Sequence, residues 1–422
     1  MHSVTNAIPT GTIASIPAKA HAHRALICAA LATSPSTILL SRTSKDIDAT
    51  MNSLRGLGAN VVYENKVVTV TPGPAPVKGN VVPHESGTTL RLLLPVAASI
   101  CNNVDVDAKG RLPDRPLEPM LGEMKAHGVT FSQDKPPFTM TGRLQGGHFS
   151  MVGDVSSQFF SGLLLAAPQI GLSTITSTTP LQSSDYVTLT TETMRDFGVE
   201  VEHTLPDTNI NEAFTIPFGA SFIGRDNYQI EGDWSNTAIW MVAAGMTGKP
   251  ITITGMNKNS VQADRRIIQV MIDAGCDVVW DGMNVTVTGR ASKPIQADLE
   301  QMPDMLPVMA ALACSISGES AFVKGARLRL KESDRLVAVA NLVRDLGGTV
   351  REDGDDLYII GSGILKGGHG DCVNDHRLVM AGTLMALISE APITLKDSEA
   401  IIKSYPDFFE DWNLLGGNAN GI

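Results

Sequence analysis

Apolar positions recur at helical spacing in six stretches of this chain, and a glycine directly follows each stretch. Apolar residues gathered on one face in this way predict amphipathic helices. A glycine placed after a helix adopts the left-handed conformation that ends it. The six glycines lie 70, 70, 77, 72 and 69 residues apart, and this regularity predicts a repeated structural unit. The stretches are residues 51–57, 120–127, 191–197, 267–274, 337–346 and 408–415.

Two short β-rich pieces follow each of the first five glycines, with a turn between them, and predict β-hairpins. The sixth unit is cut short at Ile422, where the chain ends. We therefore expect a distant segment to complete it, and residues 10–17 are the natural candidate. Examples of the predicted hairpins are residues 60–63 with 67–70, 277–280 with 285–288, and 349–351 with 357–360.

Six units of this length exceed the repeats of solenoid proteins, and they predict two similar lobes of three units each with pseudo-threefold symmetry. The expected fold class is α/β (α+β). The first lobe would comprise residues 18–228, and the second lobe residues 1–17 plus 229–422. The chain would then cross between the lobes twice, and a hinge between two lobes is a natural place for a ligand cleft. The alternative is an ordinary α/β protein whose helices happen to end in glycine.

Composition restricts the class of protein. Among 422 residues, 43% are hydrophobic and 18% are charged, as in soluble globular proteins. The formal net charge of −11 argues against a general nucleic-acid binder, because phosphate contacts need a basic face. The longest apolar runs are too short to span a membrane, and the N-terminus lacks the pattern of a secretory signal. We therefore expect a cytoplasmic protein with no nucleic-acid or membrane partner.

The cysteine and histidine pattern does not predict a metal site. The cysteines are far apart, with no Cys-x-x-Cys pair, so we expect buried small hydrophobic residues rather than disulfides or zinc ligands. His21 and His23 alternate with alanine and suggest a metal pair, but no third ligand is visible, so we favour the interpretation without metal. The five cysteines are Cys28, Cys101, Cys276, Cys314 and Cys372.

Basic residues gather where buried helices should begin. Residues 327–335 mix three arginines and a lysine with a glutamate and an aspartate, and Ser333 is a candidate cap for the next helix. Helix N-termini attract anions through their free N–H groups, although a solvated, charged helix start is the plainer alternative. Similar groups of basic, hydroxyl or amide residues at the expected starts of helices are called tips below. They occur at Lys19–Arg24, His84–Arg91, Arg115, Asp154–Gln158, Ser183–Ser184, Asp375–Arg377 and Lys403–Pro406.

Asp304 stands out because it lies among apolar residues. A carboxylate in such surroundings is expensive unless it is paired or functional. If the basic tips face one cleft, the helix dipoles and Lys/Arg side chains would create an anion-binding interior in an acidic protein. The implied ligands are small and carry several negative charges.

These tips together resemble the 5-enolpyruvylshikimate-3-phosphate synthase family. The motifs occur in order over nearly the whole chain, and their combination is far more specific than any one of them. The resemblance implies two lobes, each of three βαβαββ units, with the active-site cleft between them. It also implies transfer of the enolpyruvyl group of phosphoenolpyruvate to the 5-hydroxyl of shikimate 3-phosphate, with release of phosphate and no metal or other cofactor. A monomer that acts on these two small anions is expected.

The resemblance also implies roles for individual residues. Asp304 would take the proton of the attacking hydroxyl, and Glu332 or Lys403 would protonate the methylene carbon. Lys19 would contact both substrates. Shikimate 3-phosphate would be bound by Lys19, Ala20, Arg24, Ser156, Ser157, Gln158, Ser183, Asp304, Arg327 and Lys331. Phosphoenolpyruvate would be bound by Lys19, Gly87, Arg115, Gln158, Arg335, Arg377 and Lys403.

Two positions depart from the family pattern. Serine is usual after the first lysine and frequent before it, but Ala20 and Ala18 stand there. One hydrogen bond to the shikimate or its phosphate is therefore missing, at a cost of about 1 kcal/mol. Arg327 stands where some members have an amide, and it is a candidate for a replacement contact.

Two other functions are compatible with parts of this sequence. The sister enzyme that acts on UDP-N-acetylglucosamine has the same fold but typically carries a reactive cysteine in the first lobe, and residues 107–116 contain none. A degenerate, non-catalytic anion-binding protein would explain Ala18 and Ala20. Such a protein would not need the acid–base set of Asp304, Glu332 and Lys403.

Overall fold

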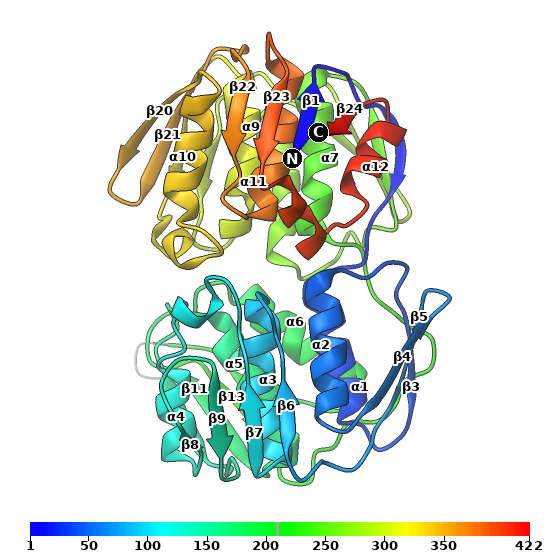
Figure 1. Cartoon of the computed structure of the whole chain (residues 1–422), viewed down its shortest axis with the longest axis vertical. Coiled ribbons are helices and arrows are strands. Elements are labelled where there is room, and N and C mark those ends of the chain that lie inside the picture. Colours follow the sequence, from blue (N-terminus) through cyan, green and yellow to red (C-terminus); the bar gives the residue numbers. More distant parts are fainter. Residues whose placement is uncertain (208–210) are drawn as a thin grey trace. The chain divides into compact units, whose positions relative to one another are not determined.

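Each of the six glycines singled out by their spacing follows a helix in the computed structural model, which describes residues 1–207 and 211–422 (Figure 1). Their φ angles lie between 86° and 106°, a range that favours glycine over residues with a β-carbon. The predicted amphipathic helices and their glycine stops are therefore confirmed. The six helices are α2 (Lys45–Gly56), α4 (Met120–Ala126), α6 (Asp185–Asp196), α8 (Ile267–Asp273), α10 (Arg335–Asp345) and α12 (Phe408–Leu414).

The chain divides into two structural units, named here by the lobes to which they correspond. The first lobe is Pro17–Ile230, where residues 18–228 were expected. The second lobe is Met1–Ile16 together with Glu231–Ile422, where residues 1–17 plus 229–422 were expected. Each lobe has a hydrophobic core of its own.

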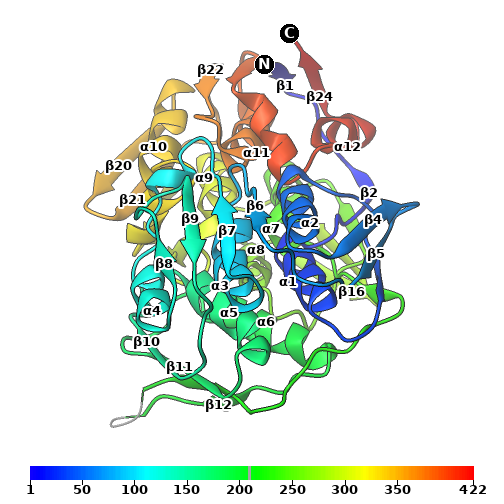
Figure 2. The same cartoon turned by 60° about the horizontal axis from the view of Figure 1, so that its bottom comes forward.

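One strand arrangement occurs six times among the described residues, three times in each lobe. Each sheet has four strands, in which a parallel pair is followed by two antiparallel pairings. The sequence β6–α3–β7–α4–β8–β9 shows how one unit is built, and it matches the βαβαββ order implied by the family resemblance. Figure 2 shows β6, β7 and β9 of this unit side by side.

The first lobe contains three of these sheets. The hairpins predicted after its glycines are the antiparallel pairs β4–β5, β8–β9 and β12–β13. In spatial order the strands are β14 (Tyr228–Gln229), β3 (Ser36–Leu39), β5 (Val67–Thr71) and β4 (Asn60–Glu64); β6 (Gly79–Val81), β7 (Asn103–Val106), β9 (Phe138–Thr141) and β8 (Thr130–Phe131); and β10 (His148–Met151), β11 (Ser173–Ser177), β13 (Ala213–Ile216) and β12 (Glu202–Thr204).

The second lobe repeats the arrangement, with the predicted hairpins β16–β17 and β20–β21. In spatial order its strands are β2 (Gly11–Ala14), β15 (Ile251–Thr254), β17 (Asn284–Thr288) and β16 (Asp277–Asp281); β18 (Gln296–Asp298), β19 (Gly318–Val323), β21 (Asp356–Gly361) and β20 (Thr349–Asp353); and β22 (Gly368–Asp371), β23 (Ile393–Lys396), β1 (His2–Thr5) and β24 (Asn418–Gly421).

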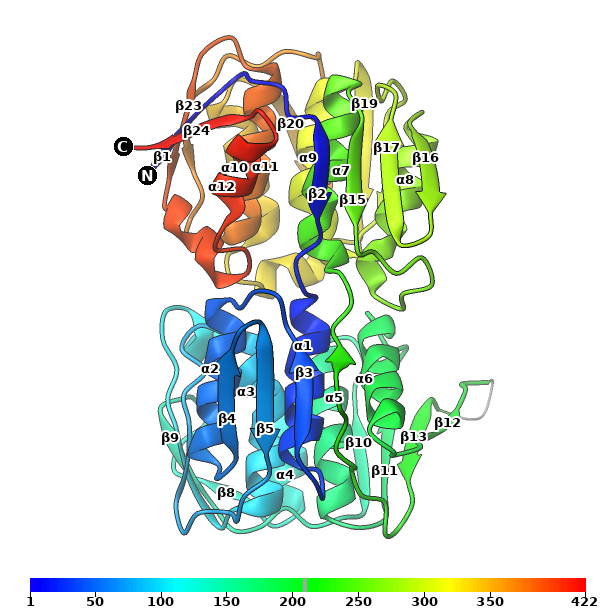
Figure 3. The same cartoon turned by 90° about the vertical axis from the view of Figure 1, so that its right-hand side faces the viewer.

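The chain passes from one lobe to the other at two places, and an edge strand comes directly before each of them. Strand β2 precedes the first lobe in sequence but pairs in parallel with β15 of the second lobe (Figure 3). Strand β14 precedes the second lobe but pairs in parallel with β3 of the first. Each of these strands therefore stays in the lobe that the chain leaves at the crossing, and it completes one sheet of that lobe.

The prediction that residues 10–17 complete the sixth unit is wrong. That unit is completed by β1, which lies between β23 and β24 and pairs antiparallel with both. Its Val4 side chain is buried in the core of the second lobe. Residues 10–17 contain β2, which instead serves the fourth unit. Both segments are short and β-rich, so local sequence does not decide which partner each one finds.

Six further helices lie inside the lobes, where nearly all of their residues are buried. Helix α3 packs against α5, and α9 packs against α7 and α11. The five cysteines are all buried and free, as predicted. The inner helices are α1 (Lys19–Ala30), α3 (Gly87–Ile100) and α5 (Ser157–Ala166) in the first lobe, and α7 (Trp234–Thr247), α9 (Leu306–Ser315) and α11 (His376–Met385) in the second.

Short 3₁₀ turns lead into or follow several of these helices. Four of them, η3, η4, η5 and η7, carry polar residues that matter for the site. No helix in the described part of the chain is both long enough and apolar enough to cross a membrane. The 3₁₀ turns are η1 (Leu112–Asp114), η2 (Ala167–Gln169), η3 (Ala263–Arg266), η4 (Pro303–Met305), η5 (Ala326–Leu330), η6 (Ala386–Ile388) and η7 (Ser398–Lys403).

Candidate active site

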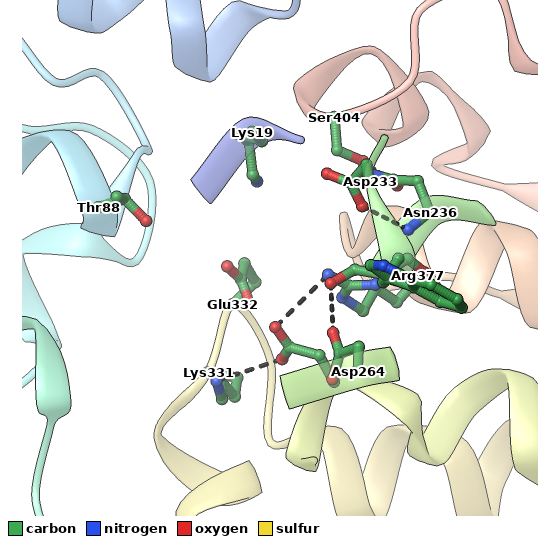
Figure 4. Close-up of polar contacts among 12 residues, drawn as sticks. Lys19, Thr88, Asp233, Asn236, Asp264, Lys331, Glu332, Arg377 and Ser404 are labelled. Atoms are coloured by element: carbon green, nitrogen blue, oxygen red, sulfur yellow. Dashed lines mark hydrogen bonds and ion pairs between the residues drawn. The ribbon is translucent and has the colours of Figure 1, made fainter. Parts of the chain in front are cut away.

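Asp304 lies in η4, directly before the buried helix α9, and it is ion-paired with three cations. Its carboxylate oxygens lie 2.8 Å from Arg335 Nη1, 3.2 Å from Lys331 Nζ and 3.4 Å from Arg377 Nη2. Figure 4 labels Lys331 and Arg377, which come from different elements, and marks their polar contacts with dashed lines. Of the two alternatives for a carboxylate among apolar neighbours, paired or functional, the structure shows that Asp304 is paired.

The three neighbouring cations keep the carboxyl group of Asp304 ionised. Burial alone would raise the pKa of this carboxyl, but Lys331, Arg377 and Arg335 outweigh burial and hold the pKa well below its ordinary value. Burial also lowers the pKa of Lys331, more strongly than Asp304 raises it. Asp304 is therefore ionised, and it is a weak base for as long as all three cations engage it.

Arg335 is the buried centre of the cluster, with 1% of its side chain exposed. Its Nε and Nη2 atoms donate to the two oxygens of Asp375 at 2.9 and 3.2 Å, a bidentate pair, and Nη2 also donates to Glu332 at 2.6 Å. Burial by itself would lower the pKa of Arg335, but Asp375, Glu332 and Asp304 raise it above its ordinary value. Arg335 thereby fixes three carboxylates around one guanidinium.

The cap of α10 differs from the prediction. Because the helix begins at Arg335, its cap is Asp334, which accepts a hydrogen bond from the N–H of Val337. Ser333 lies one residue too early, and its hydroxyl donates instead to Asp375 at 3.0 Å. Asp375 caps α11, as expected, by accepting from the N–H of Arg377 at 3.0 Å.

Two further predicted residues of the second lobe lie near the ends of 3₁₀ turns. Lys403 ends η7, and its Nζ donates to the carbonyl of Asn374 at 2.8 Å. The next residue, Ser404, donates to Asn236 at the start of α7. Arg327 is half-buried in η5 and contributes to the lowered pKa of Lys331.

Lys19 is the first residue of α1 in the first lobe, and its Nζ lies 2.8 Å from Asp46 in the first turn of α2. The sequence did not single out Asp46, although Ser44 before it caps α2 and marks a helix start. Ala18 occupies the cap position of α1 and provides no side-chain hydrogen bond there. The carbonyl of Ala20 accepts from Arg24 Nη1 at 2.7 Å.

Arg24 is buried and joins three parts of the first lobe. Besides Ala20, its guanidinium donates to Thr190 at 2.7 Å, to the carbonyl of Tyr186 at 2.9 Å and to Ser161 at 3.2 Å. These four hydrogen bonds leave one of its five N–H groups for a ligand. Its predicted contact with shikimate 3-phosphate therefore rests on that single donor.

The N-terminal turns of α3 and α5 are linked through Gln158. Its amide nitrogen donates to Thr88 at 2.8 Å, and its amide oxygen accepts from Arg91 at 3.1 Å. Ser156 caps α5 through the N–H of Gln158, and Ser157 beside it is buried. The predicted polar tips of these two buried helices are therefore held together by side-chain hydrogen bonds.

Gly87 begins α3 and lies against the guanidinium of Arg115. A β-carbon added to Gly87 would stand 2.6 Å from Arg115 Nη1, which is closer than such atoms approach. Ser183, the remaining predicted residue, is buried before α6 in the left-handed conformation, with φ of 54°. The histidines considered as a metal pair have other partners, since His21 contacts Tyr228 and His23 contacts Thr50.

A family model described as EPSP synthase (3-phosphoshikimate 1-carboxyvinyltransferase) matches residues 7–412. The chain belongs to the EPSP synthase family. A 3-phosphoshikimate 1-carboxyvinyltransferase of Clostridium kluyveri is 36% identical over 96% of this chain and 95% of its own length. Its counterpart in Methanocorpusculum labreanum is 34% identical over 97% of each chain.

The fold agrees with that of solved EPSP synthases. A structure from Acinetobacter baumannii superposes with a TM-score of 0.81 at 23% identity and covers 99% of both chains. A second structure from the same organism gives a TM-score of 0.80 at 21% identity, over 100% of this chain and 99% of the other. The predicted α/β fold with two lobes is confirmed.

Membership also confirms the predicted family and enzyme class. The EPSP synthase family transfers enolpyruvyl from phosphoenolpyruvate to shikimate 3-phosphate, in the shikimate pathway of aromatic amino acid biosynthesis. The match favours this family over the related enzyme that acts on UDP-N-acetylglucosamine. The cluster around Asp304 is therefore a part of an enolpyruvyl transferase.

Proposed function

We propose that this EPSP synthase joins phosphoenolpyruvate to the 5-hydroxyl of shikimate 3-phosphate by addition and elimination, through a tetrahedral intermediate. The observation that carries the proposal is the set of ion pairs around Asp304, in which one ionised carboxylate meets Lys331, Arg335 and Arg377. Two anionic substrates repel each other, and several cations near one potential base offset that repulsion.

The addition step needs an acid and a base on the same pair of carbons. Glu332 or Lys403 protonates the methylene carbon of phosphoenolpyruvate, which makes C2 electrophilic. The 5-hydroxyl attacks C2, and Asp304 accepts the hydroxyl proton. Elimination then removes a proton from the new methyl group and expels phosphate, which restores the double bond in the product.

The cations that weaken Asp304 as a base are the same groups assigned to the substrates. Arg335, Arg377 and Lys403 bind phosphoenolpyruvate, and Lys331 with Arg327 binds shikimate 3-phosphate. When the substrates' phosphate and carboxylate groups share these cations, Asp304 is held less strongly and becomes a better proton acceptor. The ion pairs of the cluster support this coupling between substrate binding and basicity.

The first lobe contributes the remaining contacts in this proposal. Lys19 touches both substrates, and its salt bridge with Asp46 holds it at the start of α1. Gly87, Arg115 and Gln158 bind phosphoenolpyruvate. The residues assigned to shikimate 3-phosphate in this lobe are Ala20, Arg24, Ser156, Ser157, Gln158 and Ser183.

Phosphate release tests the function most directly. Purified protein mixed with both substrates should release phosphate and form the enolpyruvyl ether in equal amounts, whereas either substrate alone should give neither. Binding of shikimate 3-phosphate without phosphate release would support the non-catalytic alternative and contradict the proposal. We further propose a cytoplasmic monomer that needs no metal or cofactor, so activity should survive chelation and the mass in solution should match one chain.

A further inference from the structure

Asp264 is a fourth carboxylate near the Asp304 cluster, and no sequence motif pointed to it. It lies in η3 with 1% of the residue exposed. Its carboxylate accepts a hydrogen bond from the hydroxyl of Ser235, in the first turn of α7. The carbonyl of the same serine accepts from Arg377 Nη1 at 3.3 Å. Asp264 therefore reaches Arg377 through Ser235, and Figure 4 shows the labelled pair next to each other.

The charges of the cluster are already balanced without Asp264. Three cations, Lys331, Arg335 and Arg377, are ion-paired with three carboxylates. An ionised Asp264, which is itself buried, adds a fourth negative charge to this largely buried group. A phosphate or carboxylate of the substrate bound at Arg377 would add more, and uncompensated buried charge is costly. The three paired carboxylates are Asp304, Glu332 and Asp375.

Asp264 is the carboxylate that is best placed to be neutralised. Burial raises its pKa first, and the charge of Asp304 raises it further, to about 6, although Arg377 and the hydroxyl of Ser235 act in the opposite direction. Asp304, in contrast, has a pKa well below its ordinary value. The charged groups that face Asp264 are Asp304 from η4, Asp233 at the cap of α7 and Arg377 from α11. Arg265 and Arg266 of its own turn donate to the carbonyls of Lys258 and Ala263.

We propose that Asp264 is a positioning residue for Arg377 that takes up a proton when phosphoenolpyruvate binds there. The inference rests on the proposed role of Arg377 in binding this substrate. The proton cancels part of the charge that the substrate brings, and the neutral carboxyl can still accept the hydrogen bond from Ser235. Asp264 touches neither substrate in this account.

The pH dependence has a definite sign. A bound anion disfavours the charged form of a nearby carboxyl, so the pKa of Asp264 rises when the substrate binds. Between the lower pKa of the free enzyme and the higher pKa of the complex, binding requires proton uptake. Affinity for phosphoenolpyruvate therefore falls as the pH rises through this window, by up to about tenfold per pH unit.

Asp264→Asn tests the proposal, because the amide cannot titrate but can accept from Ser235. We expect the ratio of KM for phosphoenolpyruvate at pH 8 to that at pH 6 to be smaller in the variant than in the unchanged enzyme, by a factor of about three or more. Titration of the substrate itself affects both proteins equally. Asp281→Asn, at an exposed strand end, is the matched control and should keep the original ratio. Equal ratios in all three proteins would overturn the proposal.

Calorimetry provides a test that does not depend on folding of the variant. Phosphoenolpyruvate is titrated into the unchanged enzyme saturated with an analogue of shikimate 3-phosphate that lacks the 5-hydroxyl, so that no turnover occurs, in buffers of different ionisation enthalpy. Net proton uptake near pH 7 is expected, and zero uptake or net release contradicts the inference. Arg377→Gln separates the two proposals. If it binds phosphoenolpyruvate normally, the assigned site is wrong; if it loses binding while Asp264→Asn keeps the original pH dependence, only the role of Asp264 fails.

Discussion

The guanidinium of Arg115 lies against Gly87, so that a β-carbon on that glycine would stand 2.6 Å from Nη1 and 3.0 Å from Cζ. The φ angle of Gly87 is not in the left-handed region, so space rather than backbone conformation requires glycine here. The atoms in the way are the far end of a flexible side chain. An alanine would therefore move Arg115 rather than unfold α3.

Gly87→Ala should accordingly raise KM for phosphoenolpyruvate by about tenfold to a hundredfold, because displacement of a binding group by about 1 Å is enough for such a loss. The melting temperature should change little. Steady-state kinetics with each substrate varied in turn will show whether the effect is confined to phosphoenolpyruvate. The control is Gly421→Ala, where an added β-carbon meets nothing within 4 Å. An unchanged KM would remove Arg115 from the substrate site.

The buried pair between Arg335 and Asp375 should matter for stability as well as for binding. Both side chains are almost fully buried, at 1% and 0% exposure. Asp375→Asn removes the negative charge of the bidentate partner of Arg335. We expect the free energy of unfolding to fall by about 3 kcal/mol or more. Urea denaturation will measure this change.

A surface pair serves as the control for that experiment. Arg344 and Glu352 are separated by a similar distance, 2.6 Å, but both are partly exposed. Glu352→Gln should cost less than about 1 kcal/mol. Equal effects of the two substitutions would mean that the buried cluster contributes no special stability.

Asp304→Ala should nearly abolish turnover while shikimate 3-phosphate still binds. Loss of a general base reduces the rate by about a hundredfold to ten-thousandfold. The cations freed from Asp304 remain available to the anionic substrate, so the dissociation constant should stay within a few-fold. Single-turnover measurements and equilibrium titration will separate these effects. The control is Asp298→Ala, at an exposed ion pair with Lys324. Near-normal turnover of Asp304→Ala would exclude Asp304 as the base.

Buried histidines should make the protein less stable in mild acid. Burial lowers the pKa of His21 to about 4, whereas an unfolded histidine titrates near 6.5. As the pH falls between these values, only the unfolded state gains the proton, so stability is lost with falling pH. His23 acts in the same direction, since burial holds its pKa well below the ordinary value.

His21→Gln should therefore reduce the acid sensitivity of the protein. The loss of unfolding free energy between pH 7 and pH 5 should shrink by roughly 2 kcal/mol relative to the unchanged chain. His148→Gln, at an exposed strand position, should leave the difference unaltered. If His21→Gln shows the same acid loss as the parent, His21 does not carry the effect.

Periodicity in the sequence was enough to predict the helices, their glycine stops and the hairpins, because each depends on residues close together in the chain. Which distant segments pair was not predictable in the same way. Strands β1 and β2 are both short and β-rich, and only packing in the second lobe assigns β1 to the sixth unit and β2 to the fourth. The predicted cap of α10 was wrong by one residue, because the helix begins at Arg335 and Asp334 is its cap, while Ser333 donates to the distant Asp375.

The site residues differ in the same way, because local sequence predicts some of them and not others. Residues in recognisable tips, such as Lys331 and Arg377, were found from sequence because charge and hydroxyl groups cluster around them. Asp264 was missed because Ala-Asp-Arg-Arg looks like an exposed, charged turn. Its importance comes from burial and from its nearness to Asp304, 40 residues away in the chain, and neither property is visible in a local motif.

The alanines near Lys19 provide the last test. Ala20 is half-buried in the first turn of α1, and its carbonyl, not its side chain, is occupied by Arg24. A serine hydroxyl at this position would add one hydrogen-bond donor beside Lys19, worth about 1 kcal/mol to an anionic ligand. Ala20→Ser should therefore lower KM for shikimate 3-phosphate about fivefold and leave kcat and KM for phosphoenolpyruvate nearly unchanged.

Ala18→Ser is the matched comparison, because this residue is fully buried at the cap position of the same helix. A hydroxyl there would act on the free N–H groups of α1 and so on stability, rather than on the ligand. Kinetics and thermal unfolding of both variants will distinguish the two effects. If Ala20→Ser does not change KM for shikimate 3-phosphate, then the start of α1 does not contact that substrate through residue 20.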